Sequence, residues 1–282
     1  VGLVLQMRHV QLVMGPAGCG KSTYCHTMHE HGLATKRNFH IVNLDPAAEH
    51  FEYPVAADIR DLIGLDDVME ELDYGPNGGL VYAFEYLNEN LEWLNDQLGE
   101  GDDDYFIFDC PGQIELYSHV PVMKSIVQAL QRWGFMVCGV YVLDSQFIAD
   151  SAKFMSGCLA CLAAMVQLEI PHVNVLSKMD LVRKKASFME RFYQPDPEEL
   201  VAELNEASNP ALYKLNAAMG SLLEDYSLVG FLPLNIHDPE SITLVLAHID
   251  HAIQYGEDVE PTDPDALGGG VEDAEEMMDG DD

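Results

Sequence analysis

The sequence predicts an α/β fold, with a mostly parallel sheet covered by helices on both faces. Strand-like apolar runs alternate with helical patterns along the chain, and these runs are apolar at successive positions rather than at every second one. A third observation is a glycine-rich motif directly after the first run, at residues 15–22. With 282 residues and 48% hydrophobic content, the chain is long enough to build a large core.

Each element is predicted from its own pattern. Runs rich in Val, Ile, Leu and Phe predict strands at 9–14, 39–44, 104–109, 136–144, 171–177 and 231–235. Helical periodicity predicts helices at 21–31, 57–72, 80–98, 119–132, 150–169, 197–206, 210–226 and 239–254. The charged, helical stretch at about 183–228 is expected to be an insertion before the last strand. One folded domain is therefore expected over residues 1–255, followed by a tail at 256–282.

The motif after the first strand reads Gly-Pro-Ala-Gly-Cys-Gly-Lys-Ser, which matches the phosphate-binding loop G-x-x-x-x-G-K-[ST]. In such a loop, backbone N–H groups and the positive end of the next helix bind phosphate oxygens. Lys21 is expected to reach the β- and γ-phosphates, and the Ser22 hydroxyl to ligate Mg²⁺. The residues predicted to contact the nucleotide here are Gly15, Pro16, Ala17, Gly18, Cys19, Gly20, Lys21, Ser22 and Thr23. These features indicate a P-loop NTPase.

A second motif, Ser177-Lys178-Met179-Asp180, follows the strand predicted at 171–177 and is a variant of the [NTS]-K-x-D element. The carboxylate of Asp180 can accept hydrogen bonds from N1–H and the 2-amino group of guanine, a donor pair that adenine lacks. The aliphatic part of Lys178 can cover the face of the base. Together with the phosphate loop, this motif predicts GTP or GDP as the ligand, bound in part by Ser177, Lys178 and Asp180.

A third motif, Asp109-Cys-Pro-Gly-Gln113, follows the strand predicted at 104–109. An acid at the tip of a core strand is where P-loop proteins hold Mg²⁺. The backbone N–H of Gly112 is expected to approach the γ-phosphate, and Gln113 to orient the attacking water.

Composition restricts the function classes. The net charge of −34 argues against direct binding to nucleic acid, and no uninterrupted apolar run approaches the length of a membrane span. The tail holds twelve acids and no Lys or Arg, so it is expected to be disordered; contact with a basic partner and a purely solubilising role both remain open. The six cysteines suit reduced thiols in the cytosol. Residues 1–6 are interpreted as a leftover ahead of Met7.

Two further segments carry a resemblance to a known family. One is Asn43-Leu-Asp45-Pro-Ala-Ala-Glu49, and the other is Gly75-Pro76-Asn77. Together with the three motifs above, they resemble those of the GPN-loop GTPases, and the similarity runs from about Arg8 to Glu257. Three phrases, which begin at Gln11, Phe108 and Ala252, match one eukaryotic paralogue of that family better than the others.

The resemblance implies a dimer, in which the loop of Gly75, Pro76 and Asn77 approaches phosphates bound by the other subunit. Asp45 resembles the family acid that either polarises the attacking water or supports the Mg²⁺ shell, so the metal set would be Ser22, Asp45 and Asp109. Gln113 and Glu115 resemble residues that position this water. The residues expected to be catalytic are Asp45, Asn77, Gln113 and Glu115.

The resemblance also implies a cellular role. It predicts a GTP-hydrolysing assembly factor for RNA polymerase II assembly and nuclear import, located in the cytoplasm and shuttling to the nucleus. The expected partners are a paralogous GPN-loop GTPase in a heterodimer, or a second copy in a homodimer, and RNA polymerase II subunits or assembly factors. Two alternatives remain: a scaffold in which GTP is structural, and a P-loop kinase for a small metabolite. The kinase would need an arginine-rich lid that the sequence does not show.

Overall fold

The computed structural model describes residues 7–99, 101, 104–183, 186–226 and 229–256. The predicted leftover at 1–6 lies outside the described residues. So does the predicted tail, apart from Gly256.

A seven-stranded sheet forms the centre of the fold, in the order β3-β2-β4-β1-β5-β6-β7. Each pair of neighbouring strands is parallel. The strands are β1 (Arg8–Met14), β2 (Phe39–Asn43), β3 (Val55–Asp58), β4 (Tyr105–Asp109), β5 (Phe135–Asp144), β6 (His172–Ser177) and β7 (Phe231–Pro233). Because the strands are parallel, their carboxyl ends meet at one edge of the sheet, where ligands of open α/β folds bind.

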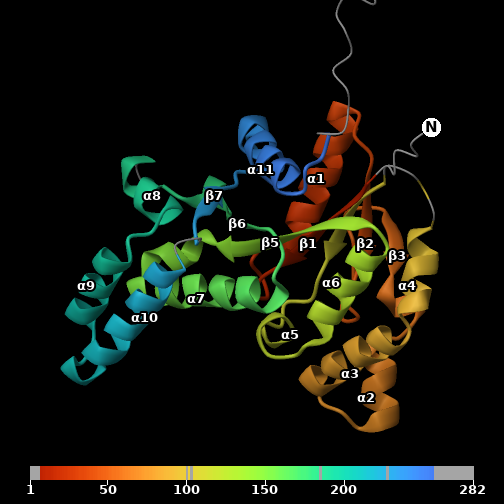
Figure 1. The fold of residues 1–282 in the computed structure, drawn as a ribbon, viewed down its shortest axis with the longest axis horizontal. Helices are drawn as coiled ribbons and strands as arrows, with labels where there is room; N and C mark the ends of the chain where they lie inside the picture. The colour runs from red at the N-terminus through yellow and green to blue at the C-terminus, as the bar shows by residue number, and fades with distance from the viewer. Residues whose placement is uncertain (1–6, 100, 102–103, 184–185, 227–228, 257–282) are drawn as a thin grey trace, which may run out of the picture.

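Helices cover both faces of this sheet (Figure 1). On one face lie α1 (Lys21–Thr35) and α11 (Pro239–Ala252), and on the other lie α5 (Glu115–Ser118), α6 (Val122–Arg132) and α7 (Ser151–Leu168). Residues of β1 show why the sequence is apolar at successive positions. Leu12 and Val13 point to opposite faces and belong to different core clusters, yet both are fully buried. The predicted α/β architecture is therefore confirmed.

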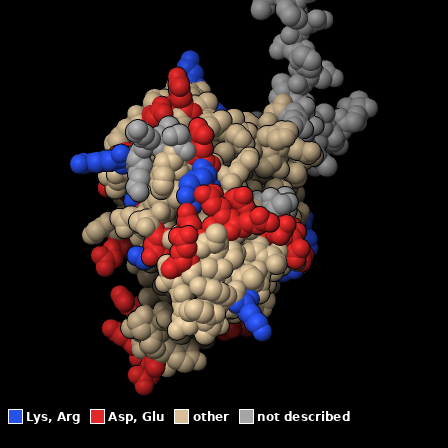
Figure 2. Space-filling model, turned by 90° about the vertical axis from the view of Figure 1, so that its left-hand side faces the viewer, with Lys and Arg blue, Asp and Glu red and all other residues tan. Residues whose placement is uncertain are grey.

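The remaining helices extend from the two ends of the sheet. Helix α4 (Leu91–Leu98) packs beside β3, whereas α3 (Pro76–Glu89) packs against α6 and α2 (Leu65–Leu72). Between β6 and β7 the chain forms α8 (Ala186–Tyr193), α9 (Pro197–Ala207) and α10 (Tyr213–Asp225), at the left end of Figure 1. Figure 2 views the molecule from this end and shows a band of Asp and Glu side chains across it. Four of the acids at this end belong to α9: Glu198, Glu199, Glu203 and Glu206.

Three predicted elements were wrong in part. The helix predicted at 57–72 begins instead with the end of β3, continues into a short 3-10 turn (Ile59–Asp61) and becomes α-helical only at Leu65. The helix predicted at 80–98 is two helices, because Asn90 leaves the helical conformation at φ −117° and ψ 37°. The segment at 75–77 was expected to be a loop, with a helix starting at Leu80. Instead, Pro76 is the first residue of α3, a position where the missing N–H of proline costs no helical hydrogen bond.

Helix α7 is long and apolar enough to cross a membrane, and it is the one such helix among the described residues. Its side chains Phe154, Cys158 and Cys161 are fully buried in the core between helix and sheet. The C-x-x-C pair of this helix therefore lies on a buried face, and burial raises the pKa of Cys158 to about 12.

Candidate nucleotide-binding site

The phosphate loop joins the carboxyl end of β1 to the first turn of α1. Gly15 has φ +139°, and a Cβ there would lie 2.2 Å from the carbonyl oxygen of Val142. Gly18 and Gly20 also have positive φ, at +74° and +95°. The glycines of the motif are thus required by backbone geometry. The Lys21 ammonium folds back over the loop and donates to the carbonyl oxygens of Gly15 at 3.1 Å and Pro16 at 3.2 Å.

A second loop, after β4, packs directly against the phosphate loop. A Cβ on Gly112 would lie 2.7 Å from Cα of Ala17, so the two backbones are in close contact. Asp109, which is 4% exposed, accepts a hydrogen bond from Tyr53 Oη at 2.6 Å and another from the Ser22 side chain. Burial raises the pKa of Asp109, although these hydrogen bonds and the charge of Lys21 lower it in part.

The side-chain oxygen Oε1 of Gln113 is buried and has no hydrogen-bond partner within the described part of the chain. An unpaired buried acceptor is costly, so a donor such as a water molecule is expected to occupy this position. This oxygen belongs to the same loop that packs on Ala17. The placement suits the predicted interaction of Gln113 with a water near the phosphates.

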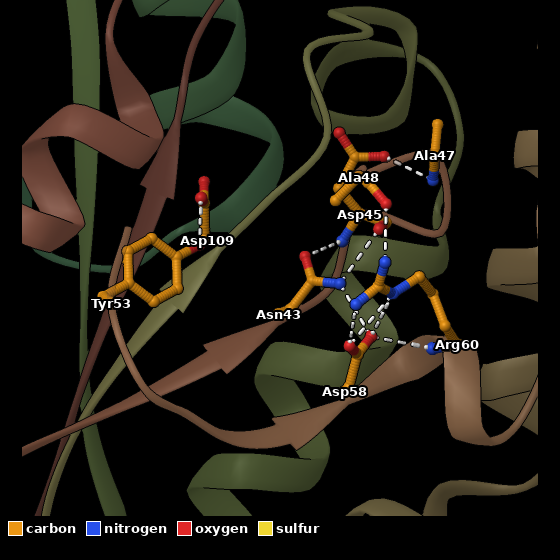
Figure 3. A network of polar contacts seen from close by, with 8 residues as sticks. All are labelled: Asn43, Asp45, Ala47, Ala48, Tyr53, Asp58, Arg60 and Asp109. Carbon is orange, nitrogen blue, oxygen red and sulfur yellow. Dashed lines mark hydrogen bonds and ion pairs between the residues drawn. The ribbon is translucent and has the colours of Figure 1, made fainter. Parts of the chain in front are cut away.

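Asp45 lies in the loop after β2, at the same edge of the sheet. Its Oδ1 accepts the backbone N–H of Ala47 at 2.9 Å (Figure 3). Burial raises the pKa of Asp45, opposed by this hydrogen bond and by the charge of Lys21. Asp45 also raises the pKa of Asp109 through charge repulsion. The fold therefore brings Asp45, Asp109 and Ser22 together from three separate segments.

These oxygens fit Mg²⁺. The ion takes oxygen ligands and keeps several waters in nucleotide sites, so one or two carboxylates with a hydroxyl are sufficient. Asp109 is buried and Asp45 is half-buried, and both have a raised pKa, so a divalent cation would stabilise their charged forms. Among the described residues, no cluster of three or more His, Cys, Asp or Glu side chains forms a metal cage of protein ligands alone.

The motif Ser177-Lys178-Met179-Asp180 is hydrogen-bonded to the phosphate loop. Ser177 Oγ donates to the carbonyl oxygen of Cys19 at 2.6 Å. Lys178 Nζ donates to the carbonyl oxygen of Gly18 at 2.7 Å and to Asp144 Oδ2 at 2.5 Å. Asp180 follows in a short 3-10 turn (Met179–Leu181), and its side chain is exposed. The structure therefore places the two predicted nucleotide motifs against each other, although they are more than 150 residues apart.

Three contacts of this region were not predicted from the sequence. Asp144, the last residue of β5, holds Lys178, and Ser145 donates to the Lys178 carbonyl oxygen at 3.1 Å. The backbone N–H of Met179 donates to the carbonyl oxygen of Leu234, just after β7. The available signal was position: Asp144 ends the strand predicted at 136–144, and Leu234 lies near the end of the one predicted at 231–235. Both strands were expected to end at the ligand edge of the sheet.

In two predicted site segments, no side chain forms a hydrogen bond or ion pair with the phosphate loop among the described residues. Gly75, Pro76 and Asn77 are exposed at the start of α3, and the Asn77 side chain makes no hydrogen bond with any described residue. Glu115 is exposed at the start of α5. The action of Asn77 across a subunit interface stays a prediction.

Comparisons with known proteins agree with this geometry. A family model described as "Conserved hypothetical ATP binding protein" matches residues 13–255. A Dictyostelium discoideum protein named GPN-loop GTPase 3 is 59% identical over 259 residues, which cover 91% of each chain. Proteins of the same name are 55% identical in Danio rerio, with 91% of this chain and 92% of that one covered, and 50% identical in Schizosaccharomyces pombe, with 90% and 94% covered.

A solved structure, a GTPase in apo form from Pyrococcus abyssi, superposes with a TM-score of 0.71. The match covers 86% of this chain and 97% of that one at 23% identity, and so supports the fold. The paralogue that the phrases at Gln11, Phe108 and Ala252 resemble is the third one, the name that these relatives carry. The chain belongs to the GPN-loop GTPase family.

Proposed function

We propose that this protein binds GTP with Mg²⁺ and hydrolyses it to GDP and phosphate, as a slow molecular switch. The observation that carries this proposal is the bonding of Ser177 and Lys178 to the backbone of the phosphate loop. With a triphosphate in that loop, the base of the same nucleotide would reach the segment that ends in Asp180. A carboxylate there selects guanine over adenine, since only guanine offers two adjacent donors. The names of the relatives support the same assignment.

The geometry around the phosphate loop supports a role for each of several residues. Lys21 and the loop N–H groups bind the β- and γ-phosphates. Ser22, Asp109 and Asp45 would hold Mg²⁺, which supplies positive charge against the phosphate oxygens. Gln113 Oε1 would accept a hydrogen bond from the attacking water and so orient it. Water oxygen bonds to the γ-phosphorus as the bond to the β–γ bridging oxygen breaks, and the proton passes to phosphate or to Asp45.

The loop at the start of α3 is proposed to act on the nucleotide of a second subunit. Gly75, Pro76 and Asn77 are exposed, and their resemblance to the family loop supports a role across a dimer interface. The Asn77 amide would donate to a phosphate oxygen or hold a water there. Glu115 is proposed to help position the attacking water. The partner would be a paralogous GPN-loop GTPase or a second copy of this chain.

The cellular role is proposed from family resemblance alone. The protein would act as an assembly factor for RNA polymerase II and its nuclear import, binding polymerase subunits or assembly factors in the cytoplasm and shuttling to the nucleus. Depletion of the protein should then leave the polymerase subunits in the cytoplasm. Unchanged subunit distribution after depletion would contradict this role while leaving the GTPase assignment intact.

The biochemical proposal is tested by nucleotide binding and single-turnover phosphate release. The unmodified protein should bind GTP more tightly than ATP and release phosphate from GTP in the presence of Mg²⁺. Lys21→Ala should lose triphosphate affinity, because it removes the charge beside the phosphates. Binding without phosphate release would instead support a scaffold with structural GTP. Phosphate transfer to a small acceptor would support the kinase alternative.

A further inference from the structure

The Asp45 loop is fixed at its start by the side chain of Asn43. This residue ends β2 and is fully buried. Its amide oxygen accepts the backbone N–H of Asp45 at 2.9 Å, and its amide nitrogen donates to the backbone oxygen of Asp45 at 3.0 Å. One side chain therefore binds both backbone groups of the residue expected to face the attacking water. A buried amide so fully bonded leaves the backbone of Asp45 little freedom.

The same loop is held at its other end by Arg60. The guanidinium donates to the carbonyl oxygen of Ala48 at 2.8 Å and to both carboxylate oxygens of Asp58, with its shortest contact at 2.6 Å (Figure 3). Asp58 Oδ1 also accepts from Asn43 Nδ2 at 2.8 Å. Asn43 and Arg60 are thus joined through Asp58, and together they span the loop from Asp45 to Ala48.

Charge and local geometry support this arrangement. Although burial raises the pKa of Asp58, the hydrogen bonds from Arg60 and Asn43 lower it below its usual value, so the carboxylate stays ionised. Within the loop, Asp45 Oδ1 accepts the N–H of Ala47 at 2.9 Å. Asp45 Oδ2 accepts no hydrogen bond from the described residues, so this oxygen is available to a further donor or to a cation.

We propose that Asn43, Asp58 and Arg60 form a clamp that positions the Asp45 carboxylate for hydrolysis, an inference that rests on the role proposed above for Asp45. The three are positioning residues, because they are bonded to one another and to the backbone of the Asp45 loop. Arg60 supplies the planar, multiply donating group that joins Asp58 to Ala48. Lysine in its place keeps the attraction for Asp58 but has no second arm for Ala48.

The test compares Arg60→Ala with Arg132→Ala, an exposed arginine at the end of α6. Three quantities are measured: GTP affinity, the single-turnover rate of GTP hydrolysis, and deuterium exchange at the amides of Ala47 and Ala48 without nucleotide. Arg60→Ala should lower the rate by roughly 10- to 100-fold, the usual effect of losing an outer-shell partner. It should raise exchange at both amides and leave GTP affinity unchanged. Arg132→Ala should change none of the three.

Two further variants isolate the positioning role. In an Asp45→Asn background, Arg60→Ala should cause no additional loss of rate, because the group that it positions is already gone. Arg60→Lys should hydrolyse GTP faster than Arg60→Ala but more slowly than the unmodified protein. If Arg60→Ala does not fold, Arg60→Lys takes its place in the comparison. The clamp is overturned by an equal loss of rate in both backgrounds, or by unchanged exchange and rate in Arg60→Ala. Absence of GTP hydrolysis in the unmodified protein would instead overturn the proposed function, and the role of the clamp with it.

Discussion

Tyr53→Phe isolates a single buried hydrogen bond at the proposed metal site. Tyr53 Oη lies 2.6 Å from Asp109 Oδ2, and the two residues are 5% and 4% exposed, so water cannot replace the lost donor without rearrangement. The phenyl ring can keep its packing against Phe51, whose ring centroid lies 5.4 Å away. The variant should therefore lose mainly the hydrogen bond to a charged group, about 1.5–3 kcal/mol of unfolding free energy at neutral pH.

This loss should depend on pH in a defined direction. Burial raises the pKa of Asp109, so the folded state binds the proton more strongly than the unfolded state, and stability falls as pH rises through the folded pKa. The Tyr53 hydrogen bond stabilises the ionised form and opposes this effect. Without it the pKa of Asp109 rises further. The difference between variant and unmodified protein should be largest at neutral pH and shrink as Asp109 becomes protonated.

The assay is urea unfolding of nucleotide-free protein in chelator, at a series of pH values. Tyr74→Phe is the matched control, because Tyr74 is 47% exposed and its hydroxyl bonds to no described residue. The control should match the unmodified protein throughout. A Tyr53→Phe variant as stable as the control at neutral pH, or one with an equal loss at every pH, would refute the reasoning.

Two other variants test the nucleotide loop and the dimer. Gly112→Ala would place a methyl group 2.7 Å from Cα of Ala17 and displace the phosphate loop, and such overpacking costs about 1–3 kcal/mol. GTP titration should therefore show weaker binding. An unchanged GTP affinity would contradict the close contact between the two loops. Asn77→Ala should lower the rate of GTP hydrolysis more than it lowers GTP affinity. The specific activity of the unmodified protein should rise with its concentration or on addition of a paralogous subunit. A hydrolysis rate independent of both protein concentration and Asn77 would exclude the dimer mechanism.

The sequence predicted those elements and motifs whose pattern is contained in a short stretch of neighbouring residues. The phosphate loop is one case, because Gly15 and Lys21 belong to a single short pattern that also sets the start of α1. The motifs at Asp109 and Ser177 follow apolar strands, and parallel strands bring their carboxyl ends together. The burial of both faces of β1 was also predictable, because its residues are apolar at successive positions.

What the sequence did not reveal depends on contacts between distant segments. Tyr53 and Asp109 are 56 residues apart, and nothing local marks Tyr53 as a partner of a metal-binding carboxylate. Asp144 meets Lys178 only because β5 and β6 are neighbours in the sheet. Strand β3 was not predicted. It has only four residues, and one of them, Asp58, is a polar residue that binds Asn43 and Arg60, so neither length nor composition indicates a buried strand.

The most direct test of the GTP assignment is a change of base preference in Asp180→Asn. An amide in place of the carboxylate cannot accept both guanine donors but can donate to the 2-oxo group of xanthine. Each charge-assisted bond is worth about 1.5–3 kcal/mol, so GTP affinity should fall at least about tenfold while affinity for xanthosine triphosphate rises. Equilibrium titration with GTP, ATP and xanthosine triphosphate measures all three affinities. Equal affinity for ATP and GTP in the unmodified protein, or no change in Asp180→Asn, would contradict the account.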